Sequence, residues 1–157
     1  MAGELLKAMA GVNLVHVPYR GGGPAINDLL GGQVQVYFAT TVASIEYIRA
    51  GRLRALAVAS ATRSETLPDI PTVGEFVPGY EAPTWYGLGA PKNTPAEIVA
   101  KLNKEINAAL ADPNMKTRLA DLGGDVLALS PADFGKLIAD DTEKWGKVIR
   151  AANIKAE

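Results

Sequence analysis

The feature that most constrains the fold is a repeated unit in the first sixty residues, in which a short apolar run precedes a helical segment. The runs and helical segments occur in the order Asn13–Pro18, Ala25–Leu30, Val34–Phe38, Val42–Ala50 and Leu53–Val58. The runs are rich in β-branched residues and end at turn residues, which is typical of buried strands. Strands that alternate with helices predict an α/β fold with a parallel sheet and helices on its faces.

The second half of the chain is richer in helical patterns. Ile98, Leu102, Ile106 and Leu110 recur at steps of four, which predicts an amphipathic helix after a capping box of Thr94 and Glu97. Asp112-Pro113 and Ser130-Pro131 predict two further helix starts. Extended strands are predicted only over Thr84–Ala90 and Val126–Leu129. These helices therefore need a sheet that this chain lacks, or one supplied by another copy of it.

Composition excludes several classes of protein. The chain has 157 residues, and its 16 Lys and Arg nearly balance 17 Asp and Glu, so no basic footprint for nucleic acid is present. It has no cysteine and one histidine, which leaves no predicted metal site and no cofactor. His16 lies inside a predicted strand, where we expect a packed structural residue.

No run of the sequence is long and apolar enough to predict a membrane span, and the first residues do not have the pattern of a signal peptide. We therefore expect either a cytosolic protein or a chain without its natural beginning. Asp140 and Asp141 are expected on an exposed helix face, and strand alternation places Trp85 and Tyr86 on opposite faces. No catalytic constellation is predicted.

The strongest candidate site is the glycine loop after the first predicted strand. Gly21, Gly22 and Gly23 precede Pro24 at a predicted helix start, so their N–H groups and the positive end of the helix favour a carboxylate or phosphate. Tyr19 and Arg20 add a hydroxyl and a guanidinium. The spacing matches neither a dinucleotide fingerprint nor a Walker loop. A tight connection without a ligand is the alternative.

A second candidate wall follows the next predicted strand, over Phe38, Ala39, Thr40 and Thr41. Its hydroxyls and the start of the following helix would face the same crevice, because ligands bind at the carboxyl ends of strands in open α/β sheets. Simple helix capping by Thr40 or Thr41 is the alternative, and the two roles are compatible.

Five motifs in this order resemble the Bug-type solute receptors of tripartite tricarboxylate transporters. They are Val17–Ala25, Gly31–Phe38, Ile48–Val58, Leu67–Val73 and Trp85–Pro91. The resemblance covers essentially the whole chain. It implies a periplasmic binding protein, type II-like, that is not an enzyme and that closes around a di- or tricarboxylate or an amino acid. It also implies membrane subunits of the transporter as partners and a periplasmic location.

The resemblance assigns ligand binding to the backbone amides of two strand–turn–helix corners. The matching positions in this sequence are Tyr19, Arg20, Gly21, Gly22, Gly23, Ala25, Phe38, Ala39, Thr40 and Thr41. It also implies the division of the chain: 1–12 as a leading helix, 13–84 as one complete parallel-sheet lobe, 85–91 as a crossover strand, and 92–157 as the helix-rich C-terminal part of the other lobe.

Members of that family are longer than this chain, so the resemblance implies a truncated receptor that lacks part of its cleft. We therefore expect weak carboxylate binding unless a second chain completes the fold. Two alternatives stay open from the sequence: a phosphate-handling α/β enzyme centred on the Gly21 loop, and an oligomerising scaffold that exposes the stripe from Ile98 to Leu110.

Overall fold

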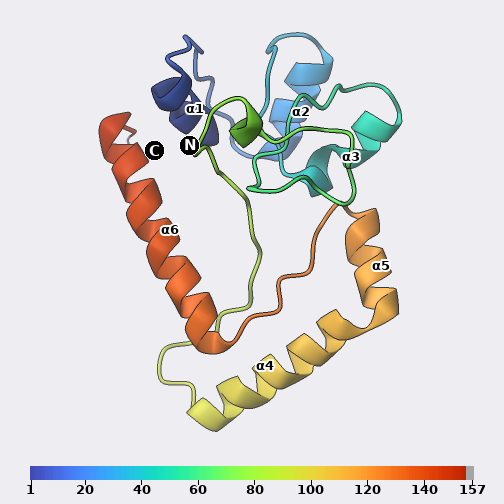
Figure 1. Ribbon diagram of the computed structural model, residues 1–157, viewed down its shortest axis with the longest axis vertical. Coiled ribbons are helices and arrows are strands. Elements are labelled where there is room, and N and C mark those ends of the chain that lie inside the picture. Colours follow the sequence, from blue (N-terminus) through green and yellow to red (C-terminus); the bar gives the residue numbers. More distant parts are fainter. Residues whose placement is uncertain (155–157) are drawn as a thin grey trace. The chain divides into compact units, whose positions relative to one another are not determined.

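The computed structural model describes residues 1–154, which form two compact units (Figure 1). Unit 1 comprises Met1–Thr84 and the turn Leu122–Gly124, and unit 2 comprises Trp85–Asp121 and the chain from Asp125. The helices are α1 (Ala2–Ala10), α2 (Gly22–Leu30), α3 (Thr41–Arg49), the short 3-10 helix η1 (Val73–Glu75), α4 (Ala96–Ala111), α5 (Pro113–Asp121) and α6 (Pro131–Ala151). The assignment of residues to receptor lobes stays a prediction.

The buried core of the described residues lies in unit 1. Its members come from α2, from α3 and from the segment around η1: Ala25, Ile26, Ser44, Ile45, Thr72, Tyr80 and Ala82. Tyr80 joins this core to α1, because its hydroxyl donates a hydrogen bond of 3.1 Å to the carbonyl of Ala2. Ile45 is the largest fully buried side chain, with 1% of its surface exposed. The middle of α3 is thus anchored in the core.

Helix boundaries agree with the sequence in most places. Gly11 ends α1 with a φ of 65°, and Ser130 begins α6 by accepting a hydrogen bond from the Asp133 N–H. The capping box predicted at Thr94 and Glu97 is wrong. The Thr94 hydroxyl instead donates to the carbonyl of Pro91, and α4 begins after Pro95.

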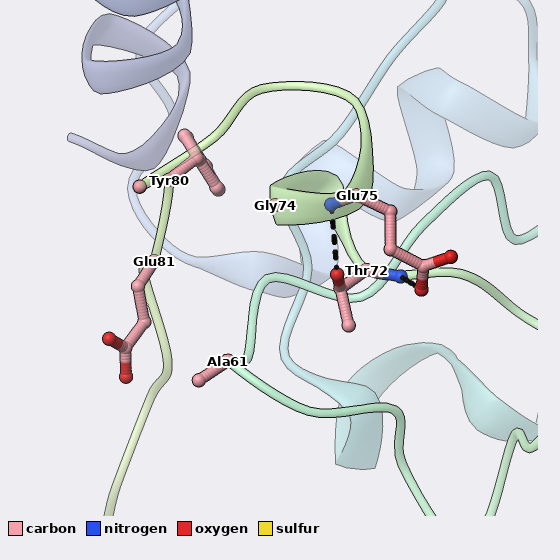
Figure 2. Close-up of a pocket in the computed structure, with 7 residues that line it drawn as sticks. Ala61, Thr72, Gly74, Glu75, Tyr80 and Glu81 are labelled. Carbon is pink, nitrogen blue, oxygen red and sulfur yellow. Dashed lines mark hydrogen bonds between the residues drawn. The ribbon is translucent and has the colours of Figure 1, made fainter.

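A capping box forms in unit 1 instead, at Thr72 and Glu75 (Figure 2). The Thr72 hydroxyl accepts from the Glu75 N–H, and the Glu75 carboxylate accepts from the Thr72 N–H. The Arg63 guanidinium also binds this carboxylate at 2.7 Å. The hydrogen bond from Arg63, and then that from the Thr72 backbone, lower the pKa of Glu75 from its usual 4.5 to about 2.

The predicted strands do not form. Over residues 1–154 the five apolar segments contain no strand, and the one β feature is an isolated parallel bridge between Val58 and Thr72. The Val58 N–H donates to the Pro71 carbonyl at 2.8 Å, and the Val73 N–H donates to the Val58 carbonyl at 2.9 Å. This pairing stops at once, because Pro71 has no N–H and η1 begins at Val73.

The predicted buried strands are also largely exposed. Val15 is 86% exposed, Leu56 is 61% exposed and Leu88 is 75% exposed. A strand requires a neighbour that offers a matching row of N–H and C=O groups. These segments find no such neighbour within the described chain, so the parallel-sheet lobe expected from the sequence is not formed.

Unit 2 is built on helices α4, α5 and α6 and has no fully buried side chain among its described residues. The Asn103 amide of α4 donates to the Leu129 carbonyl at 2.9 Å, and the Asn107 amide reaches the same carbonyl at 3.2 Å. Trp85 packs edge-on against Phe134 of α6 and donates to Asp141 at 2.6 Å. Asp141 thus has a structural role that the sequence did not predict.

The apolar stripe of α4 is only partly covered, since Ile98 is 46% exposed and Leu102 is 49% exposed. Along residues 1–154, no helix combines the length and the apolar character that a bilayer crossing requires.

Candidate functional site

The glycine loop forms the first turn of α2. Gly21 is the N-cap residue with a φ of 122°, a conformation that side-chain-bearing residues rarely adopt, and α2 begins at Gly22, three residues before the predicted start. The N–H groups of Gly21, Gly22 and Gly23 donate to no acceptor within the described chain. Unpaired first-turn N–H groups at the positive end of a helix favour an anion.

Two phenol side chains contact α2, one near its C-terminal half and one at its first turn. The Tyr19 hydroxyl donates to the Asp28 carboxylate on α2 at 2.7 Å, and this hydrogen bond is the main reason that the pKa of Tyr19 is raised. The Tyr37 hydroxyl lies 3.2 Å from the position that a Cβ would take on Gly22. The chain before Thr40 is thereby held near the start of α2. Arg20 is exposed and forms no ion pair in the part of the chain that is described.

The residues of the second candidate wall, Phe38 to Thr41, differ in their surroundings. The Phe38 ring packs on α1, where a Cβ on Gly3 would lie 3.1 Å from Phe38 Cε2. Ala39 and Thr40 are half-buried. Thr40 is the N-cap residue of α3, and its side chain makes no capping hydrogen bond. The alternative of capping by Thr40 is therefore wrong.

Thr41 contacts a turn from much later in the chain. Gly123, which is buried, lies so close that a Cβ there would be 2.5 Å from Thr41 Cγ2. The N–H groups of Thr41 and Val42 have no acceptor within residues 1–154. The start of α3 therefore resembles the start of α2 in its unpaired N–H groups. In addition, the Thr41 hydroxyl forms no hydrogen bond within the described residues.

The structure thus places the Tyr37 hydroxyl beside Gly22, and within the described residues the first amides of both helix starts have no acceptor. Ala25 is buried in the core at 2% exposure, so its side chain supports α2 from behind and does not face solvent. Sequence reasoning missed Asp28, Tyr37 and Gly123. Tyr37 sits in a predicted strand next to a predicted site residue, but no local spacing links Asp28 to Tyr19 or Gly123 to Thr41.

His16 is not the packed residue that the sequence predicted. Its side chain is 55% exposed, and Nδ1 lies 3.9 Å from the Glu4 carboxylate. In residues 1–154, no group of three or more carboxylate or imidazole side chains is placed to hold a metal.

A separate open pocket of about 360 Å³ lies beside the Thr72 capping box (Figure 2). It contains none of the predicted site residues. Glu75 and Glu81 line it, and Glu75 is held ionised by Arg63. Negative charge on this lining disfavours an anionic ligand. The buried Tyr80, the other large side chain there, directs its hydroxyl to Ala2. The pocket is therefore a poor match for a carboxylate.

The chain matches the family model described as tripartite tricarboxylate transporter family receptor over residues 1–154. It therefore belongs to this family, as the five sequence motifs predicted. This is a family of solute receptors, so the chain is not an enzyme, and the alternative of a phosphate-handling enzyme is wrong.

One relative is a UPF0065 protein from the tcbD-tcbE intergenic region of Pseudomonas sp. (strain P51). It is 42% identical over 151 residues, which are 95% of this chain and 45% of that protein. Protein BugT of Bordetella pertussis is 37% identical over 153 residues, 97% of this chain and 47% of BugT.

Solved structures show the same fold. R. palustris Rpa4515 with adipate aligns with a TM-score of 0.88 and 37% identity over 98% of this chain and 52% of its own. The periplasmic binding protein BugD aligns with a TM-score of 0.83 and 37% identity, over 99% of this chain and 53% of BugD. MatC of Rhodopseudomonas palustris with bound malate aligns with a TM-score of 0.77 and 34% identity, over 94% of this chain and 52% of MatC. The chain has the backbone course of a periplasmic binding protein and spans about half the length of these structures.

Proposed function

We propose that this chain contributes to an extracytoplasmic receptor that binds a small carboxylate for a tripartite tricarboxylate transporter. The observation that carries the proposal is the pair of helix starts in unit 1, where the N–H groups of Gly21–Gly23 and of Thr41 and Val42 have no acceptor in the described chain. Related structures hold adipate and malate. Both acids carry two carboxylates, so one class of ligand suits two anion-binding corners.

The chemistry assigns each group a role. The α2 amides donate hydrogen bonds to one carboxylate, and the exposed Arg20, which precedes them in the sequence, adds a charge-assisted hydrogen bond. The Tyr37 hydroxyl, which lies against Gly22, donates to the same group. The Tyr19 hydroxyl is already committed to Asp28 and holds the loop to α2. In this proposal Phe38 and Ala25 support the two corners by packing.

Affinity is expected to be modest. A hydrogen bond to a charged group contributes about 1.5–3 kcal/mol net, and ordering a flexible acid opposes that gain. A few such bonds give dissociation constants on the order of millimolar. The delivery of ligand to membrane subunits and the periplasmic location rest on the relatives and are part of this proposal.

The experiment is a thermal-shift titration with adipate and malate at constant ionic strength, with adipamide as the uncharged control. At a ligand concentration about a hundredfold above Kd, binding stabilises the folded state by about 2.7 kcal/mol, which raises the melting temperature by several degrees. Arg20→Gln is expected to reduce the rise, whereas Arg54→Gln, an exposed arginine of unit 1 outside both helix starts, keeps it. Equal stabilisation by adipamide, or no stabilisation by either acid, would contradict the proposal.

A further inference from the structure

The turn at Leu122–Gly124 belongs to unit 1, although the helix before it and the chain after it belong to unit 2. Gly123 has a φ of 77° and is buried. Its environment is the first residue of α3: a Cβ at position 123 would lie 2.5 Å from Thr41 Cγ2 and 3.2 Å from Thr41 Cβ. Two separate reasons therefore favour glycine at position 123: its positive φ and the short distance to Thr41.

This contact restricts the Thr41 side chain. Threonine is β-branched, and its Oγ1 and Cγ2 occupy two of the three staggered positions around χ1. Cγ2 is the Thr41 atom nearest to Gly123, so Oγ1 takes a different position on the Cβ. Within residues 1–154 this hydroxyl forms no hydrogen bond, whereas the Thr41 carbonyl accepts one from Ser44 at 3.4 Å. The side chain is thus oriented by packing and its hydroxyl remains available.

We propose that Gly123 is a positioning residue of the carboxylate site. Its close approach fixes the Thr41 rotamer so that the Thr41 hydroxyl and the free N–H groups of the first α3 turn serve the same carboxylate. This inference rests on the proposed function. It adds to the carboxylate site a residue that lies far in sequence from both the Gly21–Gly23 loop and Thr41.

Four variants separate the groups involved. Thr41→Val keeps the branched shape and removes only the hydroxyl, and Thr41→Ser keeps the hydroxyl and removes the methyl group that faces Gly123. Gly123→Ala introduces the clash, and Gly123→Ala combined with Thr41→Ser relieves it. Gly51→Ala is the control, because Gly51 also has a positive φ, 68°, but nothing lies within 4 Å of its Cβ position.

The measurement is the dissociation constant for adipate, from backbone amide NMR titrations, for each variant and for the unsubstituted chain. Thr41→Val and Gly123→Ala are each expected to weaken binding about tenfold, the loss of one hydrogen bond to a charged group. Adding Thr41→Ser to Gly123→Ala is expected to restore affinity to within about threefold of Thr41→Ser alone. Gly51→Ala is expected to bind adipate as the unsubstituted chain does.

The outcomes distinguish the two proposals. If the unsubstituted chain binds adipate and either Thr41→Val retains full affinity or the double variant shows no recovery, the positioning role of Gly123 is wrong and the proposed function stands. If the unsubstituted chain does not bind adipate at all, the proposed function fails and this inference fails with it. If Gly123→Ala does not fold, Thr41→Ser decides the outcome, because it keeps the hydroxyl and removes the methyl group that faces Gly123: weaker binding than in the unsubstituted chain supports the positioning role, and full affinity contradicts it.

Discussion

Replacing Ile45 with alanine is expected to lower the free energy of unfolding by about 2–5 kcal/mol, the usual range for a buried isoleucine. Ile45 is 1% exposed and is the largest fully buried side chain described. Unit 1 has only a handful of other buried residues, so little neighbouring material can move into the cavity. The loss falls on α3, whose first turn carries Thr41.

Urea unfolding followed by circular dichroism measures this effect. Ile98→Ala in α4 is the matched control, because the same atoms are removed from a side chain that is 46% exposed. The control is expected to cost well under 2 kcal/mol. Similar losses for both variants would mean that unit 1 does not have the core described above.

Replacing Gly87 with alanine is expected to destabilise unit 2 by about 1–3 kcal/mol, the range for overpacking. A Cβ on Gly87 would approach Phe134 Cε1 and Cε2 to 2.9 Å, closer than real side chains tolerate. Phe134 cannot move freely, because its ring packs against Trp85 with a centroid distance of 5.3 Å. Displacement of the ring would strain the hydrogen bond from Trp85 to Asp141.

The Trp85 indole N–H resonance reports this displacement directly. Gly87→Ala is expected to shift the resonance and to speed its exchange with solvent. Gly89→Ala is the control. Gly89 lies two residues after Gly87, and nothing lies within 4 Å of the position that its Cβ would take. An indole signal unchanged by Gly87→Ala would show that residues 85–87 do not pack on α6 as described.

The helices could be predicted from sequence because their signals are local. Gly11, Ser130 and the Asp112-Pro113 pair mark helix ends by chemistry within one turn, and the structure uses all three. The strands could not be predicted with the same success. Apolar, β-branched runs such as the one at Val15 show only that a segment is suited to a sheet, whereas the sheet itself depends on partners.

The unpaired segments belong to a chain that is shorter than its solved relatives. Solved relatives with the same backbone course have about twice as much chain, and this chain covers 52% of Rpa4515. Val15 and Leu88, in two of these segments, are exposed apolar residues of the described chain. Pairing of these segments with a second copy of the chain stays a prediction.

The candidate site divides in the same way. The glycine loop could be singled out from sequence, because consecutive glycines before a proline mark a helix start with free N–H groups. Its neighbours could not, since the contacts of Tyr19 with Asp28 and of Gly123 with Thr41 are made through tertiary folding. The contact of the Phe38 ring with α1 is also tertiary, and the ligand-binding role of Phe38 stays a prediction.

The most direct test of carboxylate binding at the two helix starts is a titration of the ¹⁵N-labelled chain with adipate, followed residue by residue. We expect saturable shifts that are largest at the amides of Gly21, Gly22, Gly23, Thr41 and Val42. Unchanged amides at these five positions, or shifts concentrated instead around the pocket at Thr72 and Glu81, would contradict it.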